Sequence, residues 1–360
     1  MLRRVDLLEG SWQADRGGLI PFSKSRFQEA IVADIQSWSA IRERFSDSLL
    51  LGNGASIAVS PNFGYRSLYE SATLDSQTQA IFDAFETQDF ELVLAKLWDA
   101  KQVNDALKIP SKRLTGKYES VRQALIRVVR ERHVAYSTAE RHLDAIQAFM
   151  GNFEKVVSLN YDLIVYWAMM RGNGLRRGTW FKDCFIGGQF DAEWKRFGGG
   201  YSGQEGATLV FYPHGNLALV HGKDKIVRKV VRRGHKRADL LDIVVEDWKS
   251  GNGVPLFVSE GDSRRKRKAI ARSHYLNVVF REVLTDLRES VTIYGWSMGA
   301  QDQHILDQLA KSGVKRAAVS VYCAGDVEVQ CERARTRLQS LNLNELVFFD
   351  SASPGCWNNE

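Results

Sequence analysis

Four groups of small and polar residues stand at the ends of apolar runs in this sequence, where a strand would pass into a loop. They are Gly52-Asn53-Gly54-Ala55-Ser56, Ser158-Leu159-Asn160-Tyr161-Asp162, His214-Gly215-Asn216, and Gly295-Trp296-Ser297 with Asp302. Each group alone is typical of a turn, a loop or a helix cap. In an open parallel sheet, however, ligands bind beyond the carboxyl ends of the strands, so we expect these groups to meet at one site. An imidazole can move a proton near neutral pH, and an asparagine can both donate and accept a hydrogen bond.

The elements that must position these groups follow from the apolar pattern. Short runs rich in β-branched and aromatic residues occur at 48–52, 155–161, 207–215, 255–261, 291–297, 316–325 and 344–350. Most of them end in Gly, Ser, Asn or Asp, which is typical of a strand followed by a loop. Helical periodicity lies between several of the runs, for example at 300–313. This alternation predicts an α/β fold, with a Rossmann-like parallel sheet and helices on both of its faces.

Two stretches interrupt the alternation. From 76 to 150, apolar residues recur at helical spacing, which predicts a helical insertion. Residues 171–206 are rich in glycine and aromatic residues, which predicts a long functional loop. We therefore expect an N-terminal extension at 1–45, a Rossmann domain made of 46–75 and 151–360, and the helical insertion between its two parts.

The composition is that of a globular chain. Of 360 residues, 44% are apolar and 26% are charged, so wholesale disorder is not expected. No apolar stretch reaches the roughly 18 residues of a membrane span, and the first residues lack the apolar core of a signal peptide. We expect a soluble, cytoplasmic protein that does not contact membranes.

The cysteines do not form a metal or disulfide pattern. Cys184, Cys323, Cys331 and Cys356 are scattered, and no C-x-x-C pair occurs. This spacing predicts neither a structural zinc nor a disulfide framework.

The net charge of +6 is concentrated in two basic clusters, at 223–237 and 264–268. Two solvated faces would explain them, and contact with phosphate or nucleic acid is the alternative. Aromatic residues are sparse near both clusters, which weakens base stacking as an explanation.

In combination and order, the four groups resemble the motifs of the sirtuin-like family. The motifs are "LLGNGASI", "SLNYD", "HG" and "YGWS", and the resemblance covers roughly residues 46–325. It is closest to bacterial sirtuin-like proteins without a zinc module, several of which consume NAD in antiphage defence. The stretch at 257–276 also resembles a poorly characterised bacterial branch of this group.

The resemblance gives the first glycine-rich turn a role. A dinucleotide fingerprint G-x-G-x-x-G would need a third glycine where Ile57 stands. The family binds NAD in an inverted orientation, so that glycine is not required. A turn of Gly52, Gly54 and Ala55 that leads into a helix is expected to present unpaired N–H groups to a diphosphate, with Asn53 beside them and the Ser56 hydroxyl as a further donor.

The resemblance also assigns chemistry. Nicotinamide is a cationic leaving group, so cleavage needs positioning and electrostatic support more than a strong acid. His214 would act as a general base, and Asn160 would hold the ribose or orient a water. Asp162 would anchor the carboxamide or steady its loop. Gly295 and Ser297 would contact the adenosine or the diphosphate, and Phe63 and Arg66 are candidates for closing over the nicotinamide ribose.

The function that this pattern favours is NAD glycohydrolysis, with NAD as substrate and no metal. Protein-deacylating sirtuins carry four zinc-binding cysteines in a space that here holds none, which favours hydrolysis over deacylation. The alternatives are an NAD-dependent protein deacylase or ADP-ribosyltransferase, a non-catalytic NAD or ADP-ribose sensor, and a nucleic-acid-binding protein. A free NAD hydrolase would poison its own cell, so we expect control by homo-oligomerisation, by occlusion of the site or by a partner. The resemblance implies that an ATPase, a helicase or another defence protein could be that partner.

Overall fold

The computed structural model describes residues 34–63, 68–175, 180–199, 206–222, 226–231, 240–250, 253–258 and 262–360. Within them, eight strands form one parallel sheet in the order β1-β13-β12-β11-β2-β3-β7-β4. Their bounds are β1 Ile35–Gln36, β2 Ser48–Leu51, β3 Lys155–Ser158, β4 Trp180–Lys182, β7 Ala207–Phe211, β11 Ser290–Tyr294, β12 Arg316–Val321 and β13 Glu345–Asp350. The predicted parallel α/β sheet is confirmed.

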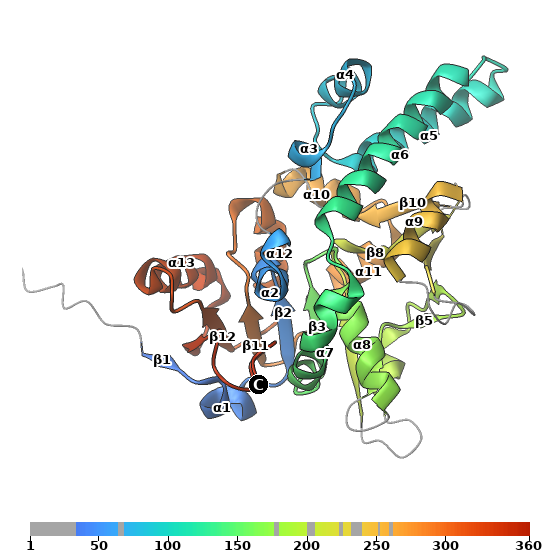
Figure 1. Cartoon of the computed structure of the whole chain (residues 1–360). Coiled ribbons are helices and arrows are strands. Elements are labelled where there is room, and N and C mark those ends of the chain that lie inside the picture. Colours follow the sequence, from blue (N-terminus) through green and yellow to red (C-terminus); the bar gives the residue numbers. More distant parts are fainter. Residues whose placement is uncertain are drawn as a thin grey trace, which may run out of the picture. The chain divides into compact units, whose positions relative to one another are not determined.

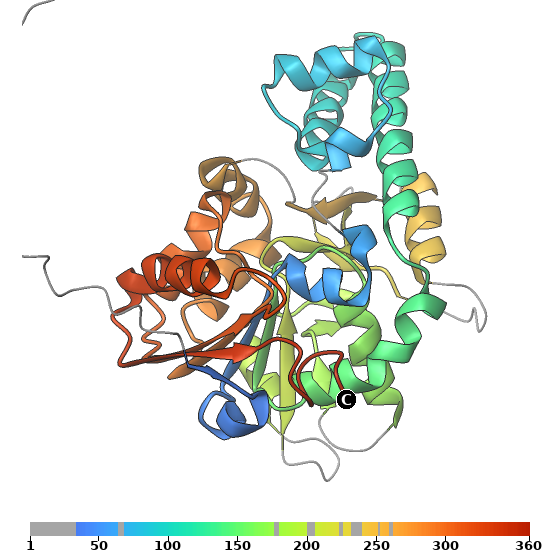
Figure 2. The same cartoon turned by 60° about the vertical axis from the view of Figure 1, so that its left-hand side comes forward.

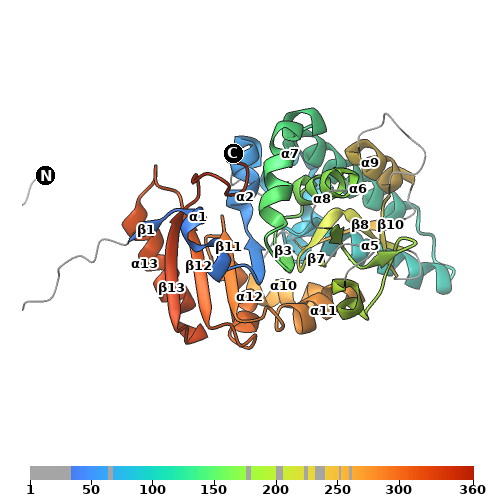
Figure 3. The same ribbon diagram turned by 90° about the horizontal axis from the view of Figure 1, so that it is seen from below.

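Helices cover both faces of this sheet, which is why its central strands are apolar on both sides. Every residue of β2 and β3 is buried. Figure 3 shows α7 (Tyr136–Met150) and α8 (Ile164–Leu175) on one side of the strands, and α12 (Gln303–Leu309) on the other. The strand order reverses at β2, which lies between β11 and β3. This topological switch point is where open α/β sheets bind their ligands.

The stretch from 76 to 150 is helical throughout, as predicted. It holds α4 (Ser76–Ala84), α5 (Phe90–Ala106), α6 (Lys112–Arg132) and α7, and no strand. In Figures 1 and 2, α5 and α6 run side by side and extend away from the sheet, together with α3 (Leu68–Ser71) and α4. The helix α7 instead packs beside the sheet, where Phe149 meets Trp38 edge to face, with ring centroids 5.0 Å apart.

A second, antiparallel sheet was not predicted. Its order is β10-β8-β9-β6-β5, with bounds β5 Phe185–Ile186, β6 Gln189–Phe190, β8 Gly215–Gly222, β9 Val227–Lys229 and β10 Gly253–Phe257. Two predictions are therefore wrong. The run at 255–261 contributes to an antiparallel strand rather than to the parallel sheet, and the described parts of 171–206 hold short strands rather than one irregular loop.

A residue with positive φ is the first residue of β8 in this second sheet. Gly215 has φ of 78° and directly follows the loop after β7, so the chain turns out of the parallel sheet there. A Cβ atom at this position would lie 2.1 Å from the carbonyl oxygen of Leu256 in β10. Only glycine therefore allows β8 and β10 to pair at this point.

The remaining elements complete the coverage. They are α1 Trp38–Ile41, α2 Asn53–Val59, α9 Leu240–Ser250, α10 Ser263–Ile270, α11 His274–Val278 and α13 Val327–Leu338, with short 3-10 or π turns at Arg42–Arg44, Pro61–Phe63, Trp194–Gly198, Val279–Val283, Ala300–Asp302 and Gln339–Leu341. None of the helices in the described ranges is long and apolar enough to cross a membrane. The four cysteines are free thiols. The domain boundaries at 45, 75 and 150 stay predictions.

Candidate functional site

The four predicted groups follow neighbouring strands at the carboxyl edge of the parallel sheet. The ends of β11, β2, β3 and β7 are adjacent in the sheet order. Backbone hydrogen bonds continue the pairing past the strand ends, from Gly52 N to Tyr294 O at 2.9 Å and from Leu159 N to Leu51 O at 2.9 Å. The topology therefore brings together residues that lie up to about 240 positions apart in the sequence.

Asn160 is held in one orientation by its amide group. Its Nδ2 donates to the carbonyl oxygen of Gly52 at 2.9 Å and to the hydroxyl of Ser56 at 2.8 Å. The Ser56 hydroxyl in turn donates to a carboxylate oxygen of Asp162. The Oδ1 atom of Asn160 makes no hydrogen bond to the described part of the chain, so an oriented acceptor on this residue, which is 8% exposed, remains for a ligand.

Asp162 is engaged by the protein itself. One oxygen accepts the Ser56 hydroxyl, and the other accepts the N–H of Ile164 at 2.9 Å, at the start of α8. The backbone carbonyl of Asp162 accepts from Nδ2 of Asn216 at 2.5 Å. Of the two roles that the resemblance allows, these contacts support steadying the loop rather than binding the carboxamide.

The glycine-rich turn differs from the prediction. The N–H groups of Gly52, Gly54 and Ala55 donate to Tyr294, Gly295 and Gly52 respectively, so the expectation that they are unpaired is wrong. The glycines are explained by a close backbone contact. A Cβ atom on Gly54 would lie 2.7 Å from the Cα of Gly295, and one on Gly52 would lie 2.4 Å from the Cα of Trp296.

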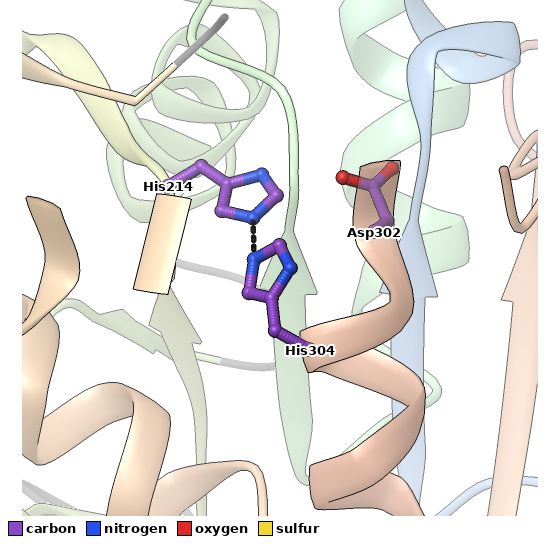
Figure 4. A group of neighbouring side chains, drawn as sticks. All are labelled: His214, Asp302 and His304. Atoms are coloured by element: carbon purple, nitrogen blue, oxygen red, sulfur yellow. Dashed lines mark hydrogen bonds between the residues drawn. The ribbon is translucent and has the colours of Figure 1, made fainter. Parts of the chain in front are cut away.

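His214 is buried and is not directed at an open space. It is 4% exposed, and its Nε2 lies 2.8 Å from Nε2 of His304 (Figure 4). Burial first, and the nearby Lys266 ammonium second, hold the pKa of His214 well below its ordinary value. Both imidazoles are therefore neutral at neutral pH, since burial also lowers the pKa of His304 to about 4.

A buried ion pair adjoins the two histidines. Nζ of Lys266 donates to Oδ1 of Asp302 at 2.9 Å, and Nε1 of Trp296 donates to Oδ2 at 3.2 Å. Burial alone would raise the pKa of Asp302, but the charge and the hydrogen bond of the Lys266 ammonium lower it below its ordinary value. Lys266 is 5% exposed, so this member of the basic cluster at 264–268 does not belong to a solvated face. The cluster at 223–237 lies largely outside the described residues.

His214, Asp302 and His304 have the donor types of a two-histidine, one-carboxylate metal site, with donor atoms within 4.8 Å of one another. The present contacts satisfy these groups differently. The two Nε2 atoms are at hydrogen-bond distance, whereas two zinc–nitrogen bonds of about 2.0–2.1 Å in tetrahedral geometry would hold them further apart. The Lys266 ammonium already neutralises the carboxylate and would repel a cation.

The predicted nicotinamide side is partly described. Asn53 fixes the position of Phe63, since its Nδ2 donates to the Phe63 carbonyl at 3.0 Å. The Phe63 ring meets His133 edge to face, and a cavity of about 30 Å³ lies between Phe63 and Tyr161. Arg66 lies outside the described residues. Ser297 is half-buried, and Gly295 donates its N–H to the Ser320 hydroxyl at 2.9 Å.

A larger cavity of about 860 Å³ lies at the opposite edge of the sheet, where β2, β3 and β7 begin. Its lining includes Asp47, Lys155 and Trp194, and none of the predicted site residues. Ligands of open α/β sheets bind at the carboxyl edge. We therefore keep the candidate site at that edge, although this cavity is larger.

Sequence reasoning missed two contributors to the site. His304 has no role in the site predicted from the sequence, and Lys266 is included there in the basic cluster at 264–268. Both lie on helices that only the tertiary fold brings to His214. The only local signal was that Asp302 and His304 follow the glycine-rich group at 295–297 closely in the sequence.

Comparison with known families places the chain. It belongs to the family described as a domain of unknown function, DUF4917, whose profile matches residues 49–357. The matched span includes all four groups of the candidate site. No curated protein matches the chain in sequence.

Proposed function

We propose that this protein is an NAD glycohydrolase, which cleaves NAD to nicotinamide and ADP-ribose. The observation that carries the proposal is the convergence of residues 52–56, Asn160, His214 and 295–297 at the switch point of a parallel sheet. The same motifs underlie the resemblance to zinc-free sirtuin-like proteins. Membership of a family of unknown function neither supports nor opposes the proposal.

The reaction needs groups that the site contains. The bond between ribose C1′ and the nicotinamide nitrogen breaks with its electron pair leaving on nicotinamide, and a water oxygen bonds to C1′ while its proton passes to a base. Asn160 offers Oδ1 as a fixed acceptor for a ribose hydroxyl or for that water. His214 is the base in this proposal, and Ser56 and Asp162 position Asn160. No step requires a metal.

The biological setting follows from the resemblance alone. We propose a regulated bacterial antiphage effector that forms homo-oligomers and responds to an ATPase, a helicase or another defence partner. The dinucleotide contacts at 52–56 and 295–297, and the roles of Phe63 and Arg66, belong to the same proposal.

The test is nicotinamide release by the purified protein from NAD, with and without phage nucleic acid, and with an acyl-lysine peptide in a separate arm. Asn160→Ala and His214→Ala should each lower the rate by about 10² or more, because positioning and acid–base catalysis contribute about 10² to 10⁴. His274→Ala is the matched control, since this exposed histidine lies at the start of α11. Equal rates for the parent and both site variants would refute the catalytic assignment, and release that depends on the acylated peptide would replace hydrolysis by deacylation.

A sensor function is the second candidate, and the position of His214 favours it. A base that is buried and has its Nε2 against His304 does not contact a substrate through that nitrogen in this arrangement. Tight NAD or ADP-ribose binding without nicotinamide release under any of these conditions would support a sensor over a hydrolase.

A further inference from the structure

Nε2 of His214 is in contact with His304, and this contact bears on how the proposed activity is controlled. A general base must direct a lone pair at the proton that it removes. Nε2 of His214 lies 2.8 Å from Nε2 of His304, so one of these two nitrogens donates to the other and the His304 ring occupies this position. With 4% of His214 exposed, a ribose hydroxyl or a water cannot reach Nε2 while His304 stays in this position.

We propose that His304 blocks the base, so that His214 and His304 form an inhibitory histidine pair that must separate before NAD is cleaved. This inference rests on the proposed function, since it names the regulation of that same site. It places the control inside the chain, at a contact between the loop after β7 and α12.

The surroundings hold His304 in this position. Its backbone N–H donates to the Ser263 hydroxyl at 2.9 Å, which connects α12 to α10. Its ring packs nearly parallel to Phe280, with centroids 6.0 Å apart. Lys266 of α10 and Asp302, two residues before His304, form the adjoining ion pair. Movement of α10 or α12 relative to the sheet would therefore separate His304 from His214.

The pair also leaves one polar atom unsatisfied. When Nε2 of His304 donates to His214, its Nδ1 is an acceptor, and this atom is buried without a hydrogen-bond partner in the described residues. An unpaired buried acceptor is unfavourable. An arrangement in which His304 turns away and Nδ1 finds a donor recovers that loss, so the closed pair can open without losing all of its hydrogen-bonding energy.

The chain offers a matched pair of variants. His304→Phe keeps an aromatic ring against Phe280 but removes both nitrogens, so it should free His214. His304→Gln keeps an amide N–H near the position of Nε2, so it should retain the contact. Circular dichroism and thermal melting establish that both variants fold.

Two readouts separate this inference from the proposed function. Diethyl pyrocarbonate acylates an accessible, unprotonated imidazole nitrogen, and peptide mass mapping measures the reaction at His214 against exposed His274. We expect His214 to be protected in the parent and in His304→Gln, and to react about tenfold faster or more in His304→Phe, the factor of one lost hydrogen bond. Basal nicotinamide release should rise by a similar factor in His304→Phe alone.

Several results would overturn the inhibitory pair. One is a His214 in the parent that reacts as fast as His274, a result that needs no variant to fold. Another is continued protection of His214 in folded His304→Phe. A third is nicotinamide release by His304→Phe at or below the rate of an active parent. If His214 becomes reactive in His304→Phe and yet no protein releases nicotinamide, the contact stands and the proposed NAD hydrolysis is what fails.

Discussion

Gly54 and Gly295 are in contact through their backbones, and this contact closes the first turn of the site onto the end of β11. The N–H of Gly54 donates to the carbonyl of Gly295 at 2.7 Å, and Gly295 itself has φ of 65°. A residue with a Cβ atom at either position would push the two turns apart. The spacing of these glycines therefore reports protein packing at the switch point, whether or not a diphosphate also binds there.

Gly54→Ala should lower the free energy of unfolding by about 1–3 kcal/mol, the usual cost of overpacking. The new methyl group would lie 2.7 Å from backbone that cannot rotate away. Gly116→Ala, at an exposed position in the second turn of α6, is the control, because its Cβ meets no atom within 4 Å. In Gly116→Ala the free energy of unfolding should rise by about 0.5–1 kcal/mol. Urea unfolding measures this free energy in both variants. Equal effects of the two variants would contradict the contact.

Site residues could be predicted from the sequence where they directly follow a strand. Asn160, His214 and the glycine turn each follow an apolar run, so sheet topology alone brings them to one edge. The partners that decide their states were not predictable in the same way. Which nitrogen of His214 is engaged depends on His304, 90 residues away, and on the packing of a helix that no local pattern places.

At the scale of elements, α10 presents two different surfaces. Its sequence, "SRRKRKAI", reads as a uniform basic segment, but a helix directs successive residues to different sides. Lys266 and Ile270, four positions apart, are buried, whereas Arg264, Arg265, Arg267 and Lys268 are exposed. One positive charge of this segment, that of Lys266, is therefore buried and pairs with Asp302.

Lys266→Met should lower the free energy of unfolding by about 3–5 kcal/mol, because removing one partner leaves the other charge buried and unpaired. Lys268→Met, in the same basic cluster, should change it by less than about 0.5 kcal/mol, since that side chain is exposed. Urea unfolding at pH 7 compares the two. If both lysines behaved alike, Lys266 would not be paired with Asp302 inside the protein.

Element types were more predictable than their connections. The runs that became β2, β3, β7, β11, β12 and β13 are short and apolar, and the helical stripes of 76–150 are long. The β5–β6 hairpin was missed because each strand has two residues and only Gly187 and Gly188 separate them, so no periodicity can be read there. The strand β10 has the same composition as a parallel strand, and only its pairing with β8 distinguishes it.

At the scale of the whole molecule, the site depends on the order of strands rather than on any one segment. The four groups meet because β2 lies between β11 and β3, so residues from both ends of the chain share one sheet edge. The same order places α10 and α12 against the loop that carries His214. A buried, neutral histidine pair at this junction links the protonation of the site to the stability of the fold.

The free energy of unfolding should fall as the pH is lowered from 7 to 5. In the folded protein the pKa of His304 is about 4, against an ordinary value of 6.5, so the unfolded chain takes up the proton first. Stability from this group is fully present above pH 6.5, is lost as the pH falls, and is gone near pH 4. The loss attributable to His304 is about 2 kcal/mol by pH 5 and about 3 kcal/mol in all.

Urea unfolding at pH 7 and at pH 5 measures this loss in the parent and in His304→Gln, which cannot titrate. We expect the parent to lose about 2 kcal/mol more than the variant between these two pH values. Lys266, Asp302, Arg267 and Asp307 also act on His304, and His214 contacts it directly, but all five residues are shared by both proteins. His274→Gln, at an exposed position, should lose as much as the parent. Equal losses in the parent and His304→Gln would mean that His304 is not held neutral in the folded protein. The buried hydrogen bond between neutral His214 and His304 would then not be present in solution.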